Sequence, residues 1–417
     1  MRPRVISNAA WMMAEKIVSV FGVIFVTSYV AKTFGPAVLG QITFSASLFS
    51  IIQAIAIFGT ETILFKHISK CPVKGIRLMA VTRRLRITLL LVTSIPVLAY
   101  VWFAMEEAFA AFALASFVAA IFITQDTFSV FNNARLASRL NTIANSIGML
   151  TSFAISFSVA LLALNPLLLT LSIVTMTLVP YLIKRFSFQR EFRTVAPPKH
   201  NPRYLRHLIY MALPLAISSI FMSAQVKMAQ LFLADVGSAH ELGLFAAANT
   251  ISASWIFIPA ALITSSFSEI FRARSEVAIK LTARLNGYVI GVSLLMLFVL
   301  VIFGEKIILA LYGQAYAQSG ELVIVLAIAT CFSAMGTVAY RYIVKEGGFN
   351  YLLKKIICLM VVSAPLSYWL IQQYGITGAA WSILISELLS LTVMNYFFKS
   401  GIIQKIQFFS FNPEAYR

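Results

Sequence analysis

The sequence predicts an all-α polytopic membrane protein of about twelve transmembrane helices in two six-helix bundles. The 417-residue chain is 60% hydrophobic, with a mean hydropathy of +0.87, whereas soluble domains contain about 45–50% apolar residues. Charged residues make up only 12% of the chain, about half of the usual ~25%. These charges cluster in short segments between long apolar runs. Such a chain requires the lipid bilayer as its solvent.

The apolar runs have the length of membrane-spanning helices, which need ~20 residues at a rise of 1.5 Å each. No run alternates as a barrel strand does, and in lipid a helix satisfies its own backbone hydrogen bonds. Glu15 and Lys16 interrupt the first run and no cleavage site follows, so we interpret it as a span and not as a signal peptide. The expected spans are 9–31, 39–60, 86–105, 109–131, 143–163, 166–184, 207–233, 242–268, 286–304, 321–341, 354–373 and 377–398.

The charge distribution predicts the orientation. Twelve spans place both termini on one side, together with the segments 61–85, 132–142, 185–206, 269–285 and 342–355. This set carries nearly all of the basic residues, whereas the connections on the other side carry only Lys32 and Lys306. Cytoplasmic loops are rich in Lys and Arg, so both termini are expected in the cytoplasm and the protein in the bacterial inner membrane. The same rule accounts for the net charge of +18, and no nucleic-acid partner is expected.

Two halves of the sequence resemble each other. Leu39-Gly40 at the start of the second span matches Leu242-Gly243 at the start of the eighth, and Thr82-Arg83-Arg84-Leu85 before the third matches Thr282-Ala283-Arg284-Leu285 before the ninth. Six spans per half is an even number, so the repeats are parallel and related by an axis along the membrane normal. We expect an N-terminal bundle over 1–190, a proline-containing cytoplasmic linker over 191–206 and a C-terminal bundle over 207–417.

Several segments, in the same order and spacing, resemble the polysaccharide flippases. They are Asn8-Ala-Ala-Trp11, Phe34-Gly-Pro-Ala-Val-Leu-Gly40, Gly243-Leu-Phe-Ala-Ala-Ala-Asn249, Trp255-Ile-Phe-Ile-Pro259, Phe267-Ser-Glu-Ile270 and Tyr374-Gly-Ile-Thr-Gly-Ala-Ala-Trp381. On these motifs the chain resembles the Wzx-type flippases of O-antigen or capsule repeat units, in the multidrug/oligosaccharidyl-lipid/polysaccharide exporter superfamily.

The resemblance implies a transporter that moves undecaprenyl-pyrophosphate-linked oligosaccharides between the leaflets by alternating access, for the assembly of O-antigen, lipopolysaccharide or a similar surface polysaccharide. It implies a polysaccharide polymerase and a chain-length regulator as partners, besides the bilayer and the lipid-linked glycan. Many relatives carry an acidic residue late in the seventh span, where this chain has Lys227 and Gln230. The coupling ion therefore stays open.

Ionisable residues inside spans are the first functional candidates, because a charge in the bilayer is costly to retain. Helical spacing places Glu15 and Ser19, beside Lys16, on the first span, and Ser219, Ser223, Lys227 and Gln230 on the seventh. We interpret these residues as the lining of a substrate cavity, with Lys227 as the partner of a phosphate. The alternative is that Glu15, Lys16 and Lys227 snorkel to the membrane interface.

Two further carboxylates are candidates for ion coupling. Glu387 lies near the middle of the last span, where burial favours its protonated form; the alternative is a neutral glutamic acid bonded between helices. Asp126 lies near the end of the fourth span, where a structural pair with Arg135 or Arg139 is the alternative.

The sequence does not indicate a catalytic or a metal-binding function. No nucleophile–base set shares a plausible pocket, and the expected periplasmic loops are too short for a catalytic domain. The three cysteines and four histidines have no metal-ligand spacing, so we expect neither a metal nor another cofactor. The alternative function is cation-coupled export of small amphipathic molecules, as in multidrug efflux.

Overall fold

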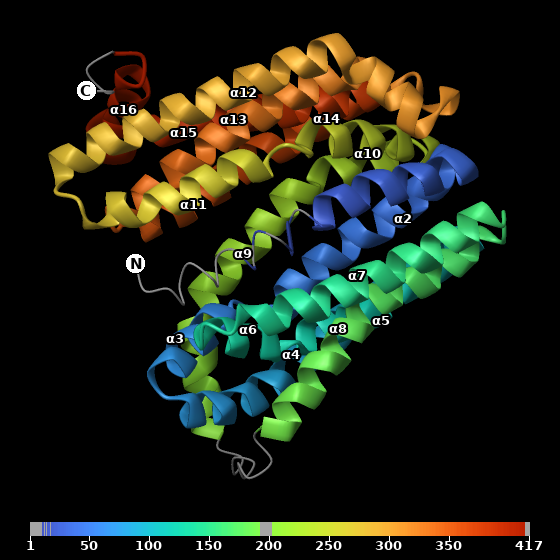
Figure 1. Cartoon of the computed structure of the whole chain (residues 1–417), viewed down its shortest axis with the longest axis horizontal. Helices are drawn as coiled ribbons and strands as arrows, with labels where there is room; N and C mark the ends of the chain where they lie inside the picture. The colour runs from blue at the N-terminus through green and yellow to red at the C-terminus, as the bar shows by residue number, and fades with distance from the viewer. Residues whose placement is uncertain (1–10, 12, 14, 17, 192–201, 413–417) are drawn as a thin grey trace. The chain divides into compact units, whose positions relative to one another are not determined.

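The computed structural model describes residues 11, 13, 15, 16, 18–191 and 202–412, and this part of the chain is helical throughout, without strands (Figure 1). Most of the expected linker, 191–206, lies outside the described residues. The α-helices are α2 (Ser28–Ile57), α3 (Thr60–Lys70), α4 (Pro72–Ala104), α5 (Glu107–Gln125), α6 (Thr127–Ala134), α7 (Ser138–Leu161), α8 (Leu169–Glu191), α9 (Pro202–Val236), α10 (Ala239–Ala253), α11 (Phe257–Arg272), α12 (Ser275–Tyr312), α13 (Ser319–Lys345), α14 (Phe349–Leu391), α15 (Val393–Tyr396) and α16 (Ile402–Phe409).

The packing divides the chain into two compact units, which we call unit 1 (Met1–Lys227) and unit 2 (Met228–Arg417). The division falls inside α9, so the first part of this helix belongs with unit 1 and its last turns with unit 2. The domain boundary expected at 191–206 stays a prediction.

Unit 1 is a bundle in which α2 packs against α4, α5 and α7, and α8 packs against α5 and α7. Its apolar contacts form two clusters. One lies where α3 meets the start of α4 and includes Leu64 and Leu78, and the other joins Val30, Phe112 and Leu169. Because α3 covers the first turns of α4, the basic end of this bundle has a core of its own.

Unit 2 is built around α13, which packs against α10, α12 and α14 (Figure 1). The short helix α16 packs against α12. Its Ile403 and Ile406 join the same apolar cluster as Phe267 and Tyr342. Helix α16, which covers one end of this unit, was not predicted from the sequence.

The lengths of the helices account for the expected number of spans. Among the described residues, nine helices are long and apolar enough to cross a membrane, and the bent pair α10 and α11 makes a tenth. Two of the nine, Val18–Ile57 and Phe349–Tyr396, contain 40 and 48 residues, about twice what one crossing needs. Each is two helices joined at a glycine, so this division restores the twelve expected spans.

The two joints are Gly35 and Gly375, with φ of 82° and 55°. A side chain is disfavoured in this left-handed region, and glycine adopts it at no steric cost. After the second joint the helices approach closely, since a Cβ on Gly378 would lie 2.0 Å from the carbonyl oxygen of Leu370. The Phe34–Gly40 and Tyr374–Trp381 motifs therefore mark helix hairpins.

Several helices extend beyond the expected spans. The segments 61–85 and 269–285 were expected to be loops, but α3 and the first turns of α4 occupy the former, and the end of α11 and the start of α12 the latter. Pro72 opens α4 at the first helical position, where a missing N–H has no consequence. The expectation of loops was wrong because polar helical turns that project beyond lipid carry no apolar signal.

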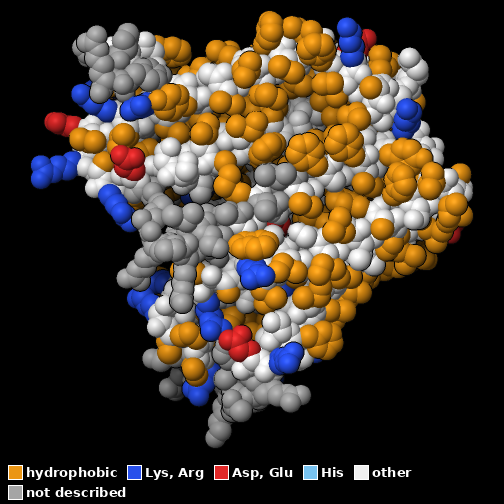
Figure 2. Space-filling view, in the orientation of Figure 1, with side chains coloured by type: hydrophobic (Ala, Val, Ile, Leu, Met, Phe, Trp, Pro, Cys, Tyr) orange, Lys and Arg blue, Asp and Glu red, His pale blue; other side chains and the backbone are white. Residues whose placement is uncertain are grey.

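The exterior is apolar along the long helices. Figure 2 shows hydrophobic side chains spread over their faces, with Lys and Arg gathered in separate places. Large side chains such as Phe103, Tyr210 and Phe298 are exposed. Exposed apolar area on this scale indicates a lipid-facing or interacting surface, and the length of the helices indicates lipid.

Candidate functional site

A break between α5 and α6 places the most buried ion pair among the described residues of unit 1. Asp126 leaves the helical conformation, with φ −76° and ψ 65°, and caps α6 by accepting a hydrogen bond from the Ser129 amide at 3.1 Å. Its other oxygen accepts from the Ser129 hydroxyl at 2.6 Å and from Lys184 Nζ at 2.7 Å. The carboxylate therefore fixes a helix end and neutralises a cation.

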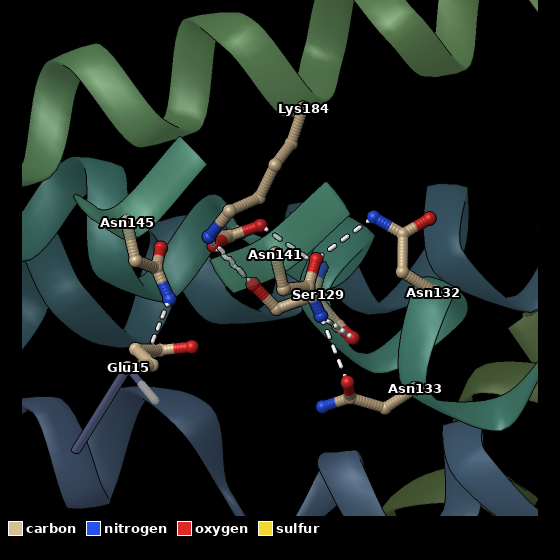
Figure 3. Close-up of polar contacts among 8 residues, drawn as sticks. Glu15, Ser129, Asn132, Asn133, Asn141, Asn145 and Lys184 are labelled. Carbon is tan, nitrogen blue, oxygen red and sulfur yellow. Dashed lines mark hydrogen bonds and ion pairs between the residues drawn. The ribbon is translucent and has the colours of Figure 1, made fainter. Parts of the chain in front are cut away.

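Lys184 reaches this carboxylate from α8, and its side chain is 3% exposed. It also donates to the Ser129 hydroxyl at 2.8 Å (Figure 3). A buried cation is tolerated when it is paired and hydrogen-bonded. The pairing with Arg135 or Arg139 considered above is wrong, because Arg135 pairs with Glu191 at 2.8 Å and Arg139 lies over the Trp11 ring.

Asparagines on α6 and α7 continue the polar network beside this pair. The Asn141 amide donates to the Ser129 carbonyl and to Asn133 Oδ1, each at 2.9 Å. Its own Oδ1 accepts from Asn132 at 2.8 Å (Figure 3). Because each amide is satisfied by a neighbour, these contacts fix the relative position of α6 and α7.

The candidates of the first span lie at the edge of this network. Glu15 is half-buried and accepts from the Asn145 amide on α7 at 2.8 Å (Figure 3). Lys16 is exposed, and Ser19 is half-buried. The structure therefore brings Glu15, but not Lys16, into contact with the asparagine side of unit 1. Their role in a substrate cavity stays a prediction.

The candidates of the seventh span lie on α9. Ser223 donates to the Ser50 carbonyl of α2 at 3.2 Å, and Ser219 donates to Ala216 in its own helix at 3.0 Å. Lys227 is half-buried and Gln230 is buried. The division between the two units falls directly after Lys227. The expected lining role of all four residues stays a prediction.

Glu387 lies on α14 in unit 2, within electrostatic range of Lys355, a cation of the same helix. Lys355 Nζ donates to the side chain of Asn395, which is fully buried, at 2.8 Å. The Tyr351 hydroxyl donates to the Met394 carbonyl nearby. Unit 2 thus holds a carboxylate and an amine among polar partners, and an ion-coupling role for Glu387 or Asp126 remains a prediction.

Lys184 and Arg86, which are buried, and Lys355, which is half-buried, are cations that were not predicted as functional candidates from the sequence. Arg86 on α4 is fully buried and donates to the Thr60 hydroxyl at 2.9 Å and the Thr124 carbonyl at 3.0 Å. Each of the three lies at or beside the end of an expected span, 86–105, 166–184 or 354–373. Their signal was the clustering of Asn, Ser and Thr in the adjoining segments, which supply partners for buried charges.

Among the described residues, no group of three or more His, Cys, Asp or Glu side chains converges as a metal site would require. What both units provide is a set of charged and amide groups inside long apolar helices. Such groups can shield a polar or charged solute from lipid.

No protein-family model matches the chain. The chain is 23% identical over 227 residues to the capsular polysaccharide biosynthesis protein CapF of Staphylococcus aureus. The match covers 52% of this chain and 56% of the relative, so it spans about half the length of each.

Two solved structures share the fold over nearly the whole chain. An inward-facing multidrug-resistance MATE family transporter of the MOP superfamily has a TM-score of 0.72 and 14% identity, with 93% of this chain and 95% of that chain covered. The lipid II flippase MurJ in an inward closed conformation has a TM-score of 0.72 and 12% identity, with 97% and 90% covered. The chain therefore has a MATE- and MurJ-like fold with two repeat halves, as the family resemblance implied.

Proposed function

We propose that this protein moves undecaprenyl-pyrophosphate-linked oligosaccharide repeat units from the cytoplasmic to the periplasmic leaflet of the inner membrane, by alternating access. The observation that carries the proposal is the likeness of fold to a lipid II flippase over 97% of this chain. The partial match to a capsular polysaccharide biosynthesis protein supports a glycan destined for the cell surface.

The physical requirement of this transport is a polar route for a pyrophosphate and a hydroxyl-rich glycan, because an unpaired charge in lipid is prohibitively costly. In the proposed mechanism the prenyl tail stays in the bilayer, and cationic and hydroxyl groups take the place of water around the head group. Lys227, with Ser219, Ser223 and Gln230, is our candidate for this role on α9, and Glu15, Lys16 and Ser19 on the first span.

The direct test is reconstitution of the purified protein in liposomes that contain a lipid-linked oligosaccharide. The glycan in the outer leaflet is oxidised with a membrane-impermeant reagent, and the fraction that stays protected is measured over time. We expect protected glycan to fall well below one half with the protein and to stay near one half without it. Equal protection in both preparations contradicts the proposal.

In cells, deletion of the gene is expected to abolish the surface polysaccharide while lipid-linked repeat units accumulate in the cytoplasmic leaflet. Normal surface polysaccharide in a clean deletion would be decisive against a flippase role. Re-expression of the wild-type chain is the control for effects on neighbouring genes.

Replacement of the proposed phosphate partner, Lys227→Ala, is expected to reduce flipping at least tenfold while the protein still reaches the membrane. A charge-assisted hydrogen bond contributes ~1.5–3 kcal/mol, which corresponds to this factor or more. Lys280→Ala, which removes an exposed cation of α12, is the matched control. Wild-type flipping by the Lys227 variant would assign the lysine to another role.

A second candidate is cation-coupled export of small amphipathic molecules, favoured by the MATE-like fold and by Glu387 inside a span. It predicts that expression lowers the accumulation of a cationic dye and that Glu387→Gln abolishes this effect. Unchanged accumulation on overexpression would remove the second candidate and leave the first untouched.

A further inference from the structure

Unit 1 contains a cavity of about 610 Å³ between α4, α5 and α8, a size typical of ligand sites. Three arginines line it, Arg83 and Arg84 from α4 and Arg185 from α8. The rest of the lining is apolar or neutral, with no carboxylate: Ala80, Ile87, Ile121, Phe122, Gln125 and Tyr181. The cavity therefore attracts an anion.

Buried neighbours hold Arg83 in a fixed position. Its Nε donates to Gln125 Oε1 at 2.8 Å, and its Nη2 donates to the Tyr181 hydroxyl at 3.3 Å. The Gln125 amide in turn donates to the Arg83 carbonyl at 3.3 Å. Gln125 and Tyr181 are 5% and 4% exposed. These neutral partners do not pair the guanidinium with an opposite charge, and they leave N–H groups of Arg83 for a ligand.

The three arginines have no counter-charge of their own, since none of them forms a salt bridge within the described part of the chain. Of the carboxylates around this end of unit 1, Glu191 is paired with Arg135 and Asp126 with Lys184, and Glu61 and Asp126 act electrostatically on the neighbouring Arg86. One turn further along α4, the fully buried Arg86 has an Nη2 without a hydrogen-bond partner among the described residues. The local charge around the cavity is therefore positive.

The cavity is polar toward the helix ends and apolar toward the middle of the spans. Arg83 and Arg84 lie in the first third of the span Gly75–Ala104, and Arg185 lies near the end of Pro166–Glu191. Ile87 and Ile121 lie further into their spans. This order matches a phospholipid, whose phosphate lies at the interface and whose acyl chains lie below it. Arginine binds phosphate oxygens in a bidentate manner.

We infer that Arg83, Arg84 and Arg185 form a site for the phosphodiester head group of an anionic phospholipid in the leaflet at the basic end of unit 1. Basic pockets between transmembrane helices bind anionic head groups in this way. The charge distribution of the sequence predicts that this leaflet is cytoplasmic. The site lies within unit 1 and does not depend on the proposed transport function.

The test is native mass spectrometry of the whole protein released from nanodiscs of phosphatidylglycerol, with phosphatidylcholine nanodiscs as the neutral comparison. We expect the wild type to retain phosphatidylglycerol, but not phosphatidylcholine. The double variant Arg84→Gln/Arg185→Gln should bind phosphatidylglycerol about thirtyfold more weakly, since each basic residue near the interface contributes about fivefold. Equal retention of the two lipids, or unchanged retention by the variant, overturns the proposal.

The controls separate lipid binding from folding and from soluble anions. Arg84 and Arg185 donate no side-chain hydrogen bond within the described chain, so their replacement should leave the thermal unfolding midpoint unchanged. Arg284→Gln removes the cation at the repeat-matched position of unit 2 and should retain the lipid. Displacement of phosphatidylglycerol by millimolar inorganic phosphate would assign the site to a soluble anion and overturn the lipid assignment. Loss of flipping in liposomes without loss of lipid retention would instead concern the proposed function alone.

Discussion

The repeat-related helices α4 and α12 share a buried threonine with the same hydrogen bond, but the residues that follow it differ in charge and exposure. Thr82 and Thr282 are both fully buried, and each donates to the carbonyl four residues earlier, at 3.1 and 2.6 Å. The next position is an exposed Arg83 in unit 1 and a fully buried Ala283 in unit 2. Four residues after the threonines, Arg86 corresponds to Asn286.

The difference continues in what covers each helix. In unit 1 the arginines of α4 line an open, basic cavity. In unit 2 Asn286 donates to the Ser410 hydroxyl, which follows α16, at 3.1 Å. Ile403 and Ile406 of α16 leave a cavity of only about 10 Å³ beside it, room for one water molecule at most. The two repeats thus share the same helical scaffold. The replacement of Arg83 by Ala283 and of Arg86 by Asn286, together with the additional helix α16, makes this end of unit 2 apolar and closed, whereas in unit 1 it is basic and open.

The largest expected effect on stability concerns the Asp126–Lys184 ion pair of unit 1. Lys184→Met leaves the half-buried Asp126 carboxylate without its cation, and loss of one partner of a buried pair costs ~3–5 kcal/mol. We expect a marked fall in the thermal unfolding midpoint in detergent and a loss of the monodisperse fraction on size exclusion.

The matched double variant Asp126→Asn/Lys184→Met removes both charges and keeps an N-cap side chain for α6. It should recover most of the stability lost in the single variant. A single variant as stable as the wild type would show that this pair does not hold the end of unit 1.

The next largest effect concerns the apolar contacts between α16 and the rest of unit 2. Ile406→Ala removes a side chain that is 3% exposed in the cluster under α16, and the cost should be about 2–3 kcal/mol, at the low end for buried isoleucine because α16 is short. Protease cleavage after Lys405 should accelerate relative to wild type. The exposed Phe408 of the same helix, changed to Ala, is the control and should leave the cleavage rate unchanged.

The smallest expected effect is a pH dependence of stability that arises from Glu346, at the end of α13. The hydrogen bond from Lys399, followed by that from Lys345, holds the pKa of the Glu346 carboxyl below its ordinary value. A carboxyl with a lowered pKa stabilises the fold at any pH above its ordinary pKa of ~4.3, and this contribution disappears as the pH falls through the lowered value.

We therefore expect the unfolding midpoint to fall by about 1–2 °C as the pH falls from 5 to 3, because a partly exposed pair contributes only ~0.2–1 kcal/mol. Glu346→Gln should remove this part of the pH dependence, whereas Glu276→Gln, at an exposed carboxylate of α12, should retain it. An identical pH profile for Glu346→Gln and wild type would contradict the assignment.

The helical class, the twelve spans and the two repeat halves could be predicted from the sequence, because lipid imposes a minimum length on every apolar run. The two helix breaks could also be predicted, because an apolar run that is too long for one span must be interrupted, and Gly35 and Gly375 lie where the expected spans end. The orientation of the termini stays a prediction.

Side-chain partners could not be predicted, because they join residues far apart along the chain. In the sequence Lys184 is simply the last residue of an expected span, and only the packing of α8 against α6 shows that it is the partner of Asp126. The eight-residue helix α16 was missed because it is too short to give a periodic signal. The basic cavity was missed because Arg83 and Arg185 are separated by about a hundred residues, so their convergence is a property of the bundle.

The glycine joints bear on how such a chain enters the membrane during synthesis. A turn made by a single residue leaves almost no hydrophilic backbone between the helices on either side of Gly35 or Gly375, so apart from Lys32 little polar material has to cross the bilayer when the pair is inserted. Each pair can therefore integrate as one prefolded unit, and a longer, charged insertion at either glycine would impede biogenesis before it could affect transport.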